Sequence, residues 1–499
     1  MEGPMISRRR FLSGALATGF AAAAGSSALR GVRAFARPPE PPSSPPNLVF
    51  VFPDQMRGQA MGFLGGEPVR TPVLDRFARE SVVFTQAAVN YPICSPYRAM
   101  LWSGKYPFRN GVTENLTSEA GRRGLEFRAG ERCLSDVLKD KGYSLGYIGK
   151  WHLDAPRKPY IDCSNNRAEP AWNEWTPPER RHGFDFWLAY GTYDQHLRPM
   201  YWSTDAPRDG FAYVDQWGPE HEADLAARYI RNEGGRYRDP RKPFALVVSM
   251  NPPHMPYDQV PRRYLDMYGT VPLEDLVRRP NIPAAGTRWG DYYRNNIRGY
   301  YAMITGVDEQ FGRILAVLEE SGLTEETIVV FTSDHGNCLG LHDEISKNNP
   351  YEESMRVPLL VRWQGRIRPR REGALISVPD MMPTLLGLMG FGADIPRGVE
   401  GTDFSWLFRT GKGNRPSSQL YLRVPVNDPK AGARGVRTDR YTFVLRRAEG
   451  RDPQTVLFDN EADPYQMNDI AGREPGLAKR LLAEELRPWL ERTGDPWRS

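Results

Sequence analysis

Two apolar runs in this chain of 499 residues end in side chains that can bind a metal ion. The runs cover residues 48–52 and 328–332, and the donors that follow them are Asp54 with Gln55 and Asp334 with His335. Ligands of open α/β sheets bind beyond the carboxyl ends of the strands, so these donors could converge on one divalent ion. The alternative is that each aspartate caps the helix or turn that follows its strand.

A cysteine motif and a set of companions favour the metal site. Residues 94–98 read Cys-Ser-Pro-Tyr-Arg, and Ser-Gly-Lys-Tyr-Pro follows at 103–107. Three fixed positions in five are common by chance, but further motifs follow in order: Gly-Lys-Trp-His at 149–152, Pro-His-Met-Pro-Tyr at 253–257, Ser-Asp-His-Gly at 333–336, Lys347, and Pro-Tyr-Glu-Glu-Ser at 350–354. This ordered set resembles the signature of the type I sulfatases of the alkaline phosphatase superfamily, and the resemblance extends from Asn47 to Ile470.

The resemblance implies a sulfuric ester hydrolase in which Cys94 is oxidised to Cα-formylglycine. One hydroxyl of the hydrated aldehyde attacks sulfur, the second loses its proton, and the aldehyde reforms as sulfate departs. The positions that match the metal ligands are Asp54, Gln55, Asp334 and His335, with an oxygen on residue 94 completing the shell. Arg98, Lys150 and Lys347 would offset the charge of the sulfate, His152 would assist the elimination, and His254 with Lys347 would protonate the leaving oxygen.

The metal ligands depart from the commonest pattern of the family. Many relatives have two consecutive acids after the first strand and Asp-Asn at the later one, whereas this chain has Gln55 and His335 at the second position of each pair. The resemblance to the family implies calcium as the first choice. Fewer carboxylates and one imidazole make a less hard site, which keeps manganese or magnesium as alternatives. The same Asp-Gln and Asp-His pairs occur in formylglycine-dependent relatives that hydrolyse phosphonate monoesters and phosphodiesters. Hydrolysis of those substrates is therefore the leading alternative function. A second alternative is a non-catalytic binding protein for sulfated ligands.

The substrate is expected to be a sulfated small molecule or carbohydrate. Residues 154–198 are rich in aromatic side chains and histidine, including Trp172, Trp175, Trp187, Tyr190 and His196. These side chains could stack on sugar rings at the mouth of the pocket or pack a long insertion.

The elements that would position these residues form an α/β fold. Apolar runs at 48–52, 144–148, 244–250, 327–332 and 357–361 predict strands buried on both faces, and therefore a mainly parallel sheet sandwiched by helices. The spacing of Ile304, Val307, Phe311, Ile314 and Leu318 predicts a helix that stops near Gly322. We expect a catalytic domain at 47–411 and, at 412–499, a smaller C-terminal α+β domain with an antiparallel sheet and one helix.

The N-terminus resembles a twin-arginine export signal at residues 1–36, with Arg8, Arg9 and Arg10 before an alanine-rich run, and a proline-rich linker follows at 37–46. The alternative, a membrane anchor, is disfavoured because the run is short and rich in glycine and alanine. The expected location is therefore the periplasm or the exterior, and the mature form is not expected to span a membrane. The expected partners are the twin-arginine translocation machinery and a formylglycine-generating enzyme.

The composition is that of a globular enzyme, with 40% hydrophobic and 25% charged residues. The first 36 residues hold five arginines and one glutamate, so their removal lowers the net charge from +5 to +1. A nearly neutral protein has no global attraction to nucleic acid, and none is expected as a partner. Four cysteines are too few for a disulfide scaffold, and Cys133, Cys163 and Cys338 are expected to be structural or free.

Overall fold

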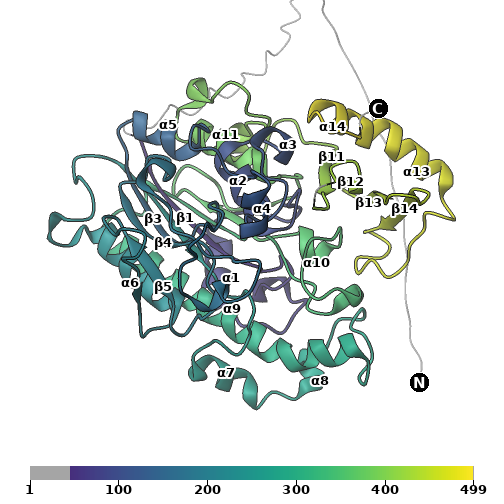
Figure 1. Cartoon of the computed structure of the whole chain (residues 1–499), viewed down its shortest axis with the longest axis horizontal. Helices are drawn as coiled ribbons and strands as arrows, with labels where there is room; N and C mark the ends of the chain where they lie inside the picture. The colour runs from purple at the N-terminus through teal and green to yellow at the C-terminus, as the bar shows by residue number, and fades with distance from the viewer. Residues whose placement is uncertain (1–44, 427, 498–499) are drawn as a thin grey trace, which may run out of the picture. The chain divides into compact units, whose positions relative to one another are not determined.

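A ten-stranded sheet forms the centre of the molecule in the computed structural model, which describes residues 45–426 and 428–497 (Figure 1). The predicted export signal and nearly all of the predicted linker lie outside the described residues. In sheet order the strands are β10 (Arg370–Glu372), β2 (Val82–Phe84), β9 (Leu359–Arg362), β8 (Thr327–Thr332), β1 (Asn47–Pro53), β7 (Phe244–Met250), β3 (Ser144–Lys150), β4 (Phe186–Tyr190), β5 (Met200–Ser203) and β6 (Ala212–Tyr213).

The five central strands, from β8 to β4, are parallel, which confirms the prediction of a mainly parallel sheet. Every residue of β1, β3, β7 and β8 is buried, as the continuous apolar runs predict. The run at 357–361 also forms a strand, β9, but it lies antiparallel to both β8 and β2. Apolar patterning predicts burial of a strand but carries no information about its direction.

Helices cover both faces of the sheet (Figure 1). Leu48, Phe50 and Phe52 of β1 pack into one core cluster with residues of α2, α5, α11 and α12, whereas Val49 and Val51 pack into a second cluster with α1, α6, α7 and α9. The helices are α1 (Pro72–Arg79), α2 (Cys94–Ser103), α3 (Pro107–Asn110), α4 (Ser118–Arg122), α5 (Leu134–Asp140), α6 (Gly218–Arg231), α7 (Arg262–Gly269), α8 (Leu273–Leu276), α9 (Arg288–Glu320), α10 (Glu352–Met355), α11 (Val378–Leu388), α12 (Ser405–Thr410), α13 (Pro475–Leu481) and α14 (Arg487–Arg492).

Helix α9 contains the helical stripe expected around residues 304–318 and ends just before Gly322. Single-turn 3-10 segments are η1 (Gly62–Leu64), η2 (Ser164–Asn166), η3 (Pro178–Arg180), η4 (Glu233–Gly235), η5 (Leu341–Asp343) and η6 (Gly392–Asp394), and η7 (Leu482–Leu486) is a π-helical segment that joins α13 to α14. None of the helices in the described ranges is long and apolar enough to span a membrane.

A second sheet of four antiparallel strands occupies the C-terminal part, with α13 and α14 after it (Figure 1). Its strands are β11 (Ser418–Arg423), β12 (Gly432–Thr438), β13 (Tyr441–Arg447) and β14 (Gln454–Asp459). Alternating segments of the sequence at 419–423, 441–446 and 455–459 predict β11, β13 and β14. No such pattern predicts β12, because β12 buries two arginines. Arg434 forms an ion pair with Asp495 at 2.5 Å, and Arg437 forms one with Glu352 at 2.7 Å. Charged side chains therefore occupy buried positions of β12 where an alternating strand would have apolar residues.

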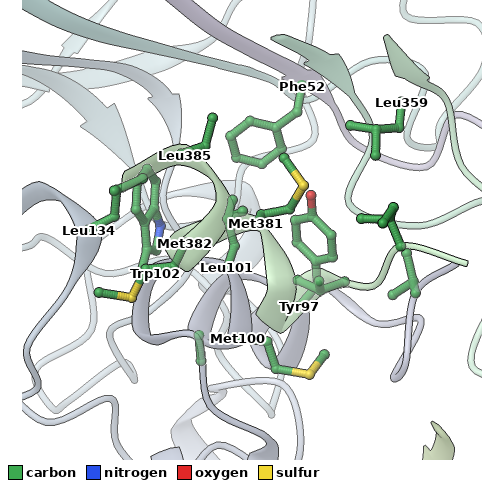
Figure 2. Close-up of a cluster of buried hydrophobic side chains, with 14 of the residues drawn as sticks. Phe52, Tyr97, Met100, Leu101, Trp102, Leu134, Leu359, Met381, Met382 and Leu385 are labelled. Atoms are coloured by element: carbon green, nitrogen blue, oxygen red, sulfur yellow. The ribbon is translucent and has the colours of Figure 1, made fainter. Parts of the chain in front are cut away.

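Helix α2 is held against the sheet by packing along its whole length, since all ten of its residues are buried. Figure 2 shows Tyr97 and Leu101 of α2 among Phe52 of β1 and Met381 and Met382 of α11. The rings of Tyr97 and Phe52 lie 6.2 Å apart. This packing holds the N-terminal end of α2, where Cys94 lies, near the end of β1.

Candidate active site

The two strand-ending aspartates meet at one edge of the sheet. Asp54 directly follows β1, Asp334 follows the neighbouring parallel strand β8, and both carboxylates are completely buried. Ligand atoms of Asp54, Asp334, His335 and Cys94 all lie within 4.8 Å of one another. The tertiary structure therefore brings together the donors that the sequence separates by 280 residues, and the alternative of two independent caps does not explain this convergence.

Gln55 lies beside this cluster in a left-handed backbone conformation with φ of 74°. Its backbone N–H donates to Asp334 Oδ1 at 3.0 Å, and its side-chain amide donates to Ser346 Oγ at 3.1 Å. The carboxamide oxygen, Oε1, accepts from Lys347 Nζ at 3.4 Å. The oxygen of Gln55 is thus directed to the charged side of the site, as a metal ligand requires.

Cys94 is the first residue of α2, and its side chain is surrounded by charged groups. Sγ lies 3.4 Å from His335 Nε2 and 3.4 Å from Lys347 Nζ, and it lies 3.9 Å from Lys150 Nζ. Burial and Asp54 raise the pKa of the thiol, but the positive charges of Lys150, Lys347 and His335 outweigh them and hold the pKa well below its ordinary value. An anionic group at position 94 is therefore stabilised.

Arg98 lies one helical turn after Cys94 and so projects from the same face of α2. Nη2 donates to Asp334 Oδ2 at 3.1 Å and to Asp54 Oδ2 at 3.3 Å. Nη1 donates to the Lys150 carbonyl and to Ser249 Oγ. One guanidinium thus connects the ends of four strands, β1, β8, β3 and β7.

Lys150, the last residue of β3, forms a buried ion pair with Asp54, with Nζ 2.6 Å from Oδ2. Burial alone would raise the pKa of Asp54, but Lys150 and Lys347 lower it well below its ordinary value. Burial and the neighbouring Asp54 charge raise the pKa of Asp334 to about 6. Two buried carboxylates this close repel each other, so a divalent cation would stabilise both.

His152 is completely buried in a left-handed conformation with φ of 52°. Neither ring nitrogen has a hydrogen-bond partner among the described residues, and burial lowers the pKa of the ring to about 4. A neutral imidazole with a free nitrogen can accept a proton. The rings of His152 and the half-buried Trp172 lie 6.1 Å apart.

His254 follows β7 by four residues and exposes 15% of its side chain. Its Nδ1 lies 2.8 Å from the Met255 carbonyl and 3.3 Å from Asp194 Oδ1. Lys347 exposes 13% of its side chain and lies 3.9 Å from Asp54 as well as 3.4 Å from Cys94. Every residue predicted for the site is therefore located in or beside one cluster.

Two polar residues of this cluster were missed by the sequence analysis. Asn251 accepts from Lys150 Nζ at 3.1 Å and donates to Asp194 Oδ1 at 3.2 Å. Asn251 directly follows β7, so the same strand-end signal that identified Asp54 could have found it. Asp194 lies in an irregular loop between β4 and β5, where no pattern points to it.

Most of the aromatic residues singled out in segment 154–198 pack inside the fold, and one of them lies where it could stack on a sugar ring. Trp187 and Tyr190 belong to β4 and are buried, and His196 is buried too. Trp175 donates its indole N–H to the Ala206 carbonyl and packs against a small satellite core. Residues 154–198 are thus partly a continuation of the main sheet, and Trp172 is the member of the set that stays half-buried beside a predicted catalytic side chain.

The donor set fits a divalent cation. Two buried carboxylates, one imidazole and the side chain of residue 94 converge, and the amide oxygen of Gln55 lies beside them, 3.4 Å from Lys347 Nζ. Three cations, Arg98, Lys150 and Lys347, lie against the same group. Oxygen-rich ligands suit calcium, magnesium or manganese, and three nearby cations suit an anionic substrate. A site of this composition can bind a metal ion together with a sulfate or phosphate group.

The chain belongs to the sulfatase family. Residues 46–391 match the family model for sulfatases, and residues 340–491 match the model for the C-terminal part of N-sulphoglucosamine sulphohydrolase. The predictions of a sulfuric ester hydrolase and of an alkaline phosphatase-like fold are thereby confirmed.

Similar proteins cover nearly the whole chain. It is 39% identical to an endo-4-O-sulfatase of Bacteroides thetaiotaomicron, over 91% of this chain and 93% of that protein. It is 34% identical to an ulvan-active sulfatase of Formosa agariphila, over 91% and 83% of the two chains. The crystal structure of YidJ from Bacteroides fragilis aligns with a TM-score of 0.88 at 51% identity, covering 93% of this chain and 98% of that one.

Proposed function

We propose that this sulfatase hydrolyses sulfate esters of carbohydrates through a Cα-formylglycine formed from Cys94. The observation that carries the proposal is the position of Cys94 at the start of α2, within 4.8 Å of ligand atoms of Asp54, Asp334 and His335 and within 3.9 Å of two lysine ammonium groups. The hydrated aldehyde supplies a nucleophilic hydroxyl and a second hydroxyl for the release of sulfate.

The metal ion that we propose is calcium, with manganese or magnesium as alternatives, held by Asp54, Gln55, Asp334, His335 and residue 94. When bound, it would stabilise the ionised nucleophile and the sulfate oxygens. The buried ion pair with Lys150 keeps Asp54 ionised and ready to bind. Arg98 holds both carboxylates in place through one guanidinium group.

Side chains of the site would neutralise charge and transfer the protons during the reaction. Lys347 and Lys150 would offset the growing negative charge on the sulfate, since both reach the side chain of residue 94. His152, neutral because it is buried, would accept the proton of the second hydroxyl in the elimination. His254, with Lys347 beside the site, would donate a proton to the leaving oxygen.

The substrate class rests on two supports. The curated relatives at 39% and 34% identity are an endo-4-O-sulfatase and an ulvan-active sulfatase. Trp172 lies half-buried beside His152, so its indole could stack on a sugar ring that enters the site. We therefore propose a sulfated polysaccharide or its oligosaccharides as the substrate.

We further propose that the protein is exported by the twin-arginine route to the periplasm or the exterior after a formylglycine-generating enzyme has modified Cys94 in the cytoplasm. The support is the arginine-rich N-terminus and the need to install the modification before a folded protein crosses the membrane.

The test begins with the chemical state of residue 94. The chain is expressed with a formylglycine-generating enzyme, and the mass of the peptide that contains Cys94 is expected to show conversion of the thiol to the aldehyde. The modified protein is then assayed on 4-O-sulfated and ulvan oligosaccharides, 4-nitrophenyl sulfate, and an aryl phosphonate monoester.

We expect sulfate release from at least one oligosaccharide, no turnover by Cys94→Ala, and unchanged turnover by Cys163→Ala, which removes a buried cysteine that lies outside the metal-binding cluster. A Cys94→Ala variant as active as the parent would refute formylglycine catalysis. Faster cleavage of the phosphonate than of every sulfate ester would instead establish the phosphonate hydrolase alternative.

A further inference from the structure

A carboxylate that no sequence motif identifies lies against His254. Asp194 is in the loop between β4 and β5, and its side chain exposes 30% of its surface. Asn165 holds it from one side, because Asn165 Nδ2 donates to Asp194 Oδ2 at 2.8 Å and Asn165 Oδ1 accepts from the Asp194 backbone N–H at 3.2 Å. Asn251 donates to the other oxygen, Oδ1, at 3.2 Å. Two hydrogen bonds to the carboxylate and one from the backbone N–H therefore fix Asp194 in addition to its contact with His254.

The contacts of His254 define which of its nitrogens carries a proton. Nδ1 lies 2.8 Å from the Met255 carbonyl and 3.3 Å from Asp194 Oδ1, and both are acceptors, so Nδ1 carries hydrogen. Nε2 has no hydrogen-bond partner among the residues that the structure describes, which leaves it free for a substrate. The backbone carbonyl of His254 also accepts from His196 Nε2 at 2.9 Å, so the residue is held at both ends.

The charges around the pair keep Asp194 ionised. Burial raises the pKa of Asp194, but the neighbouring His254 outweighs it and lowers that pKa below its usual range, so the carboxylate stays ionised. His196 is buried, and its pKa falls to about 4, so this second imidazole is neutral and does not compete for the negative charge. Lys150 also lowers the pKa of Asp194.

A polar chain connects this pair to the metal-binding cluster. Lys150 Nζ donates to Asp54 Oδ2 at 2.6 Å and to Asn251 Oδ1 at 3.1 Å, and Asn251 Nδ2 donates to Asp194 Oδ1. The amide of Asn251 thus connects Asp194 to Lys150, and Lys150 in turn pairs with Asp54. The imidazole of His254 is in this way positioned relative to the carboxylate that would bind the metal.

We propose that Asp194 is a positioning residue that fixes the ring of His254 through Nδ1–H and stabilises its protonated form, so that Nε2–H can be given to the leaving oxygen. As the sulfur–oxygen bond of the substrate breaks, the proton passes from Nε2 to the departing alkoxide, and His254 is left neutral with its remaining proton on Nδ1. This inference rests on the proposed role of His254 in sulfate ester hydrolysis.

The test is a double-mutant cycle on a cleaved oligosaccharide sulfate, with the fraction of modified Cys94 measured for every variant. Asp194→Asn keeps the size of the side chain and removes its charge. We expect this variant to lower kcat by about 10- to 100-fold and to change KM by less than about threefold. The expected loss is smaller than the whole contribution of a general acid, because His254 itself remains. Because Asp194 acts through His254, the double variant Asp194→Asn/His254→Ala is expected to be no slower than His254→Ala alone.

A second readout separates positioning from a structural role. The 4-nitrophenolate leaving group needs little protonation, so Asp194→Asn and His254→Ala are both expected to lower kcat/KM on 4-nitrophenyl sulfate much less than on the oligosaccharide sulfate. The matched control is Asp215→Asn, which removes an exposed carboxylate that pairs with Arg198 and is expected to leave both activities unchanged.

Two results would overturn the inference: equal losses on both substrates for Asp194→Asn, or a double variant slower than His254→Ala by the full factor of Asp194→Asn. A His254→Ala variant with equal losses on both substrates would instead overturn the proposed role of His254 itself. The His254→Ala arm therefore distinguishes failure of the inference from failure of the proposed function.

Discussion

Glu222 is a buried carboxylic acid, and its raised pKa makes the stability of the folded protein depend on pH. It lies on α6, is fully buried, and accepts a hydrogen bond from Tyr201 O–H at 3.0 Å through Oε1, while Oε2 has no partner in the described structure. Glu222 lies close to the end of β3, because a Cβ atom added to Gly149, the residue before Lys150, would lie 3.1 Å from Glu222 Oε1. Burial raises the pKa of Glu222 to about 8, against an ordinary value of 4.5.

The sign of the effect follows from proton binding. Between pH 4.5 and 8 the folded chain keeps the proton on Glu222 while the unfolded chain loses it, so this residue makes the protein less stable as pH rises. At about 1.4 kcal/mol per pH unit, the cost grows by about 3 kcal/mol between pH 5 and pH 8. Glu222→Gln removes this cost because the amide does not ionise and retains an oxygen that can accept from Tyr201.

The measurement is urea unfolding of both proteins at pH 5 and pH 8, followed by tryptophan fluorescence. We expect Glu222→Gln to exceed the parent by about 1 kcal/mol at pH 5 and by about 4 kcal/mol at pH 8. Glu319→Gln, on an exposed position of α9, is the matched control and is expected to change stability equally at both values. A Glu222→Gln effect independent of pH would refute the argument.

Three further predictions concern the site and its support. Gly149→Ala is expected to abolish turnover and lower the thermal midpoint, because φ is 102° and the new Cβ would lie 2.1 Å from the Ser249 carbonyl; circular dichroism separates misfolding from local displacement. Arg279→Met is expected to cost about 3 to 5 kcal/mol in denaturant unfolding, since it leaves the buried Glu67 and Glu353 without this shared partner, and a loss below about 1 kcal/mol would contradict it. Chelation is expected to abolish sulfate release and lower the melting temperature, with recovery on adding calcium, manganese or magnesium; activity that survives exhaustive chelation would contradict a metal role.

Much of the proposed catalytic set could be predicted from the sequence, because strand-ending aspartates form a local pattern and the ordered motifs resemble the sulfatase signature. The aspartates after two buried strands, and the cysteine with an arginine four residues later, are local patterns in a chain that must end its parallel strands at one edge. Four of the five central strands, β1, β3, β7 and β8, were also predicted, since burial on both faces demands continuous apolar residues. Strand β4 was not predicted, because only part of it is fully buried.

The direction of β9, the existence of β12 and the role of Asp194 came from the tertiary structure. Strand β9 is as apolar as the parallel strands of the sheet, so its sequence does not reveal that it runs antiparallel to β8. Strand β12 lacks an alternating apolar pattern because it contains the buried Arg434 and Arg437, which form ion pairs with acids distant in the sequence. Asp194 contacts His254 across 60 positions through an irregular loop with no periodicity. The protonation of His152, Glu222 and the buried carboxylates depends on burial and on charges from other strands, which no local segment of sequence contains.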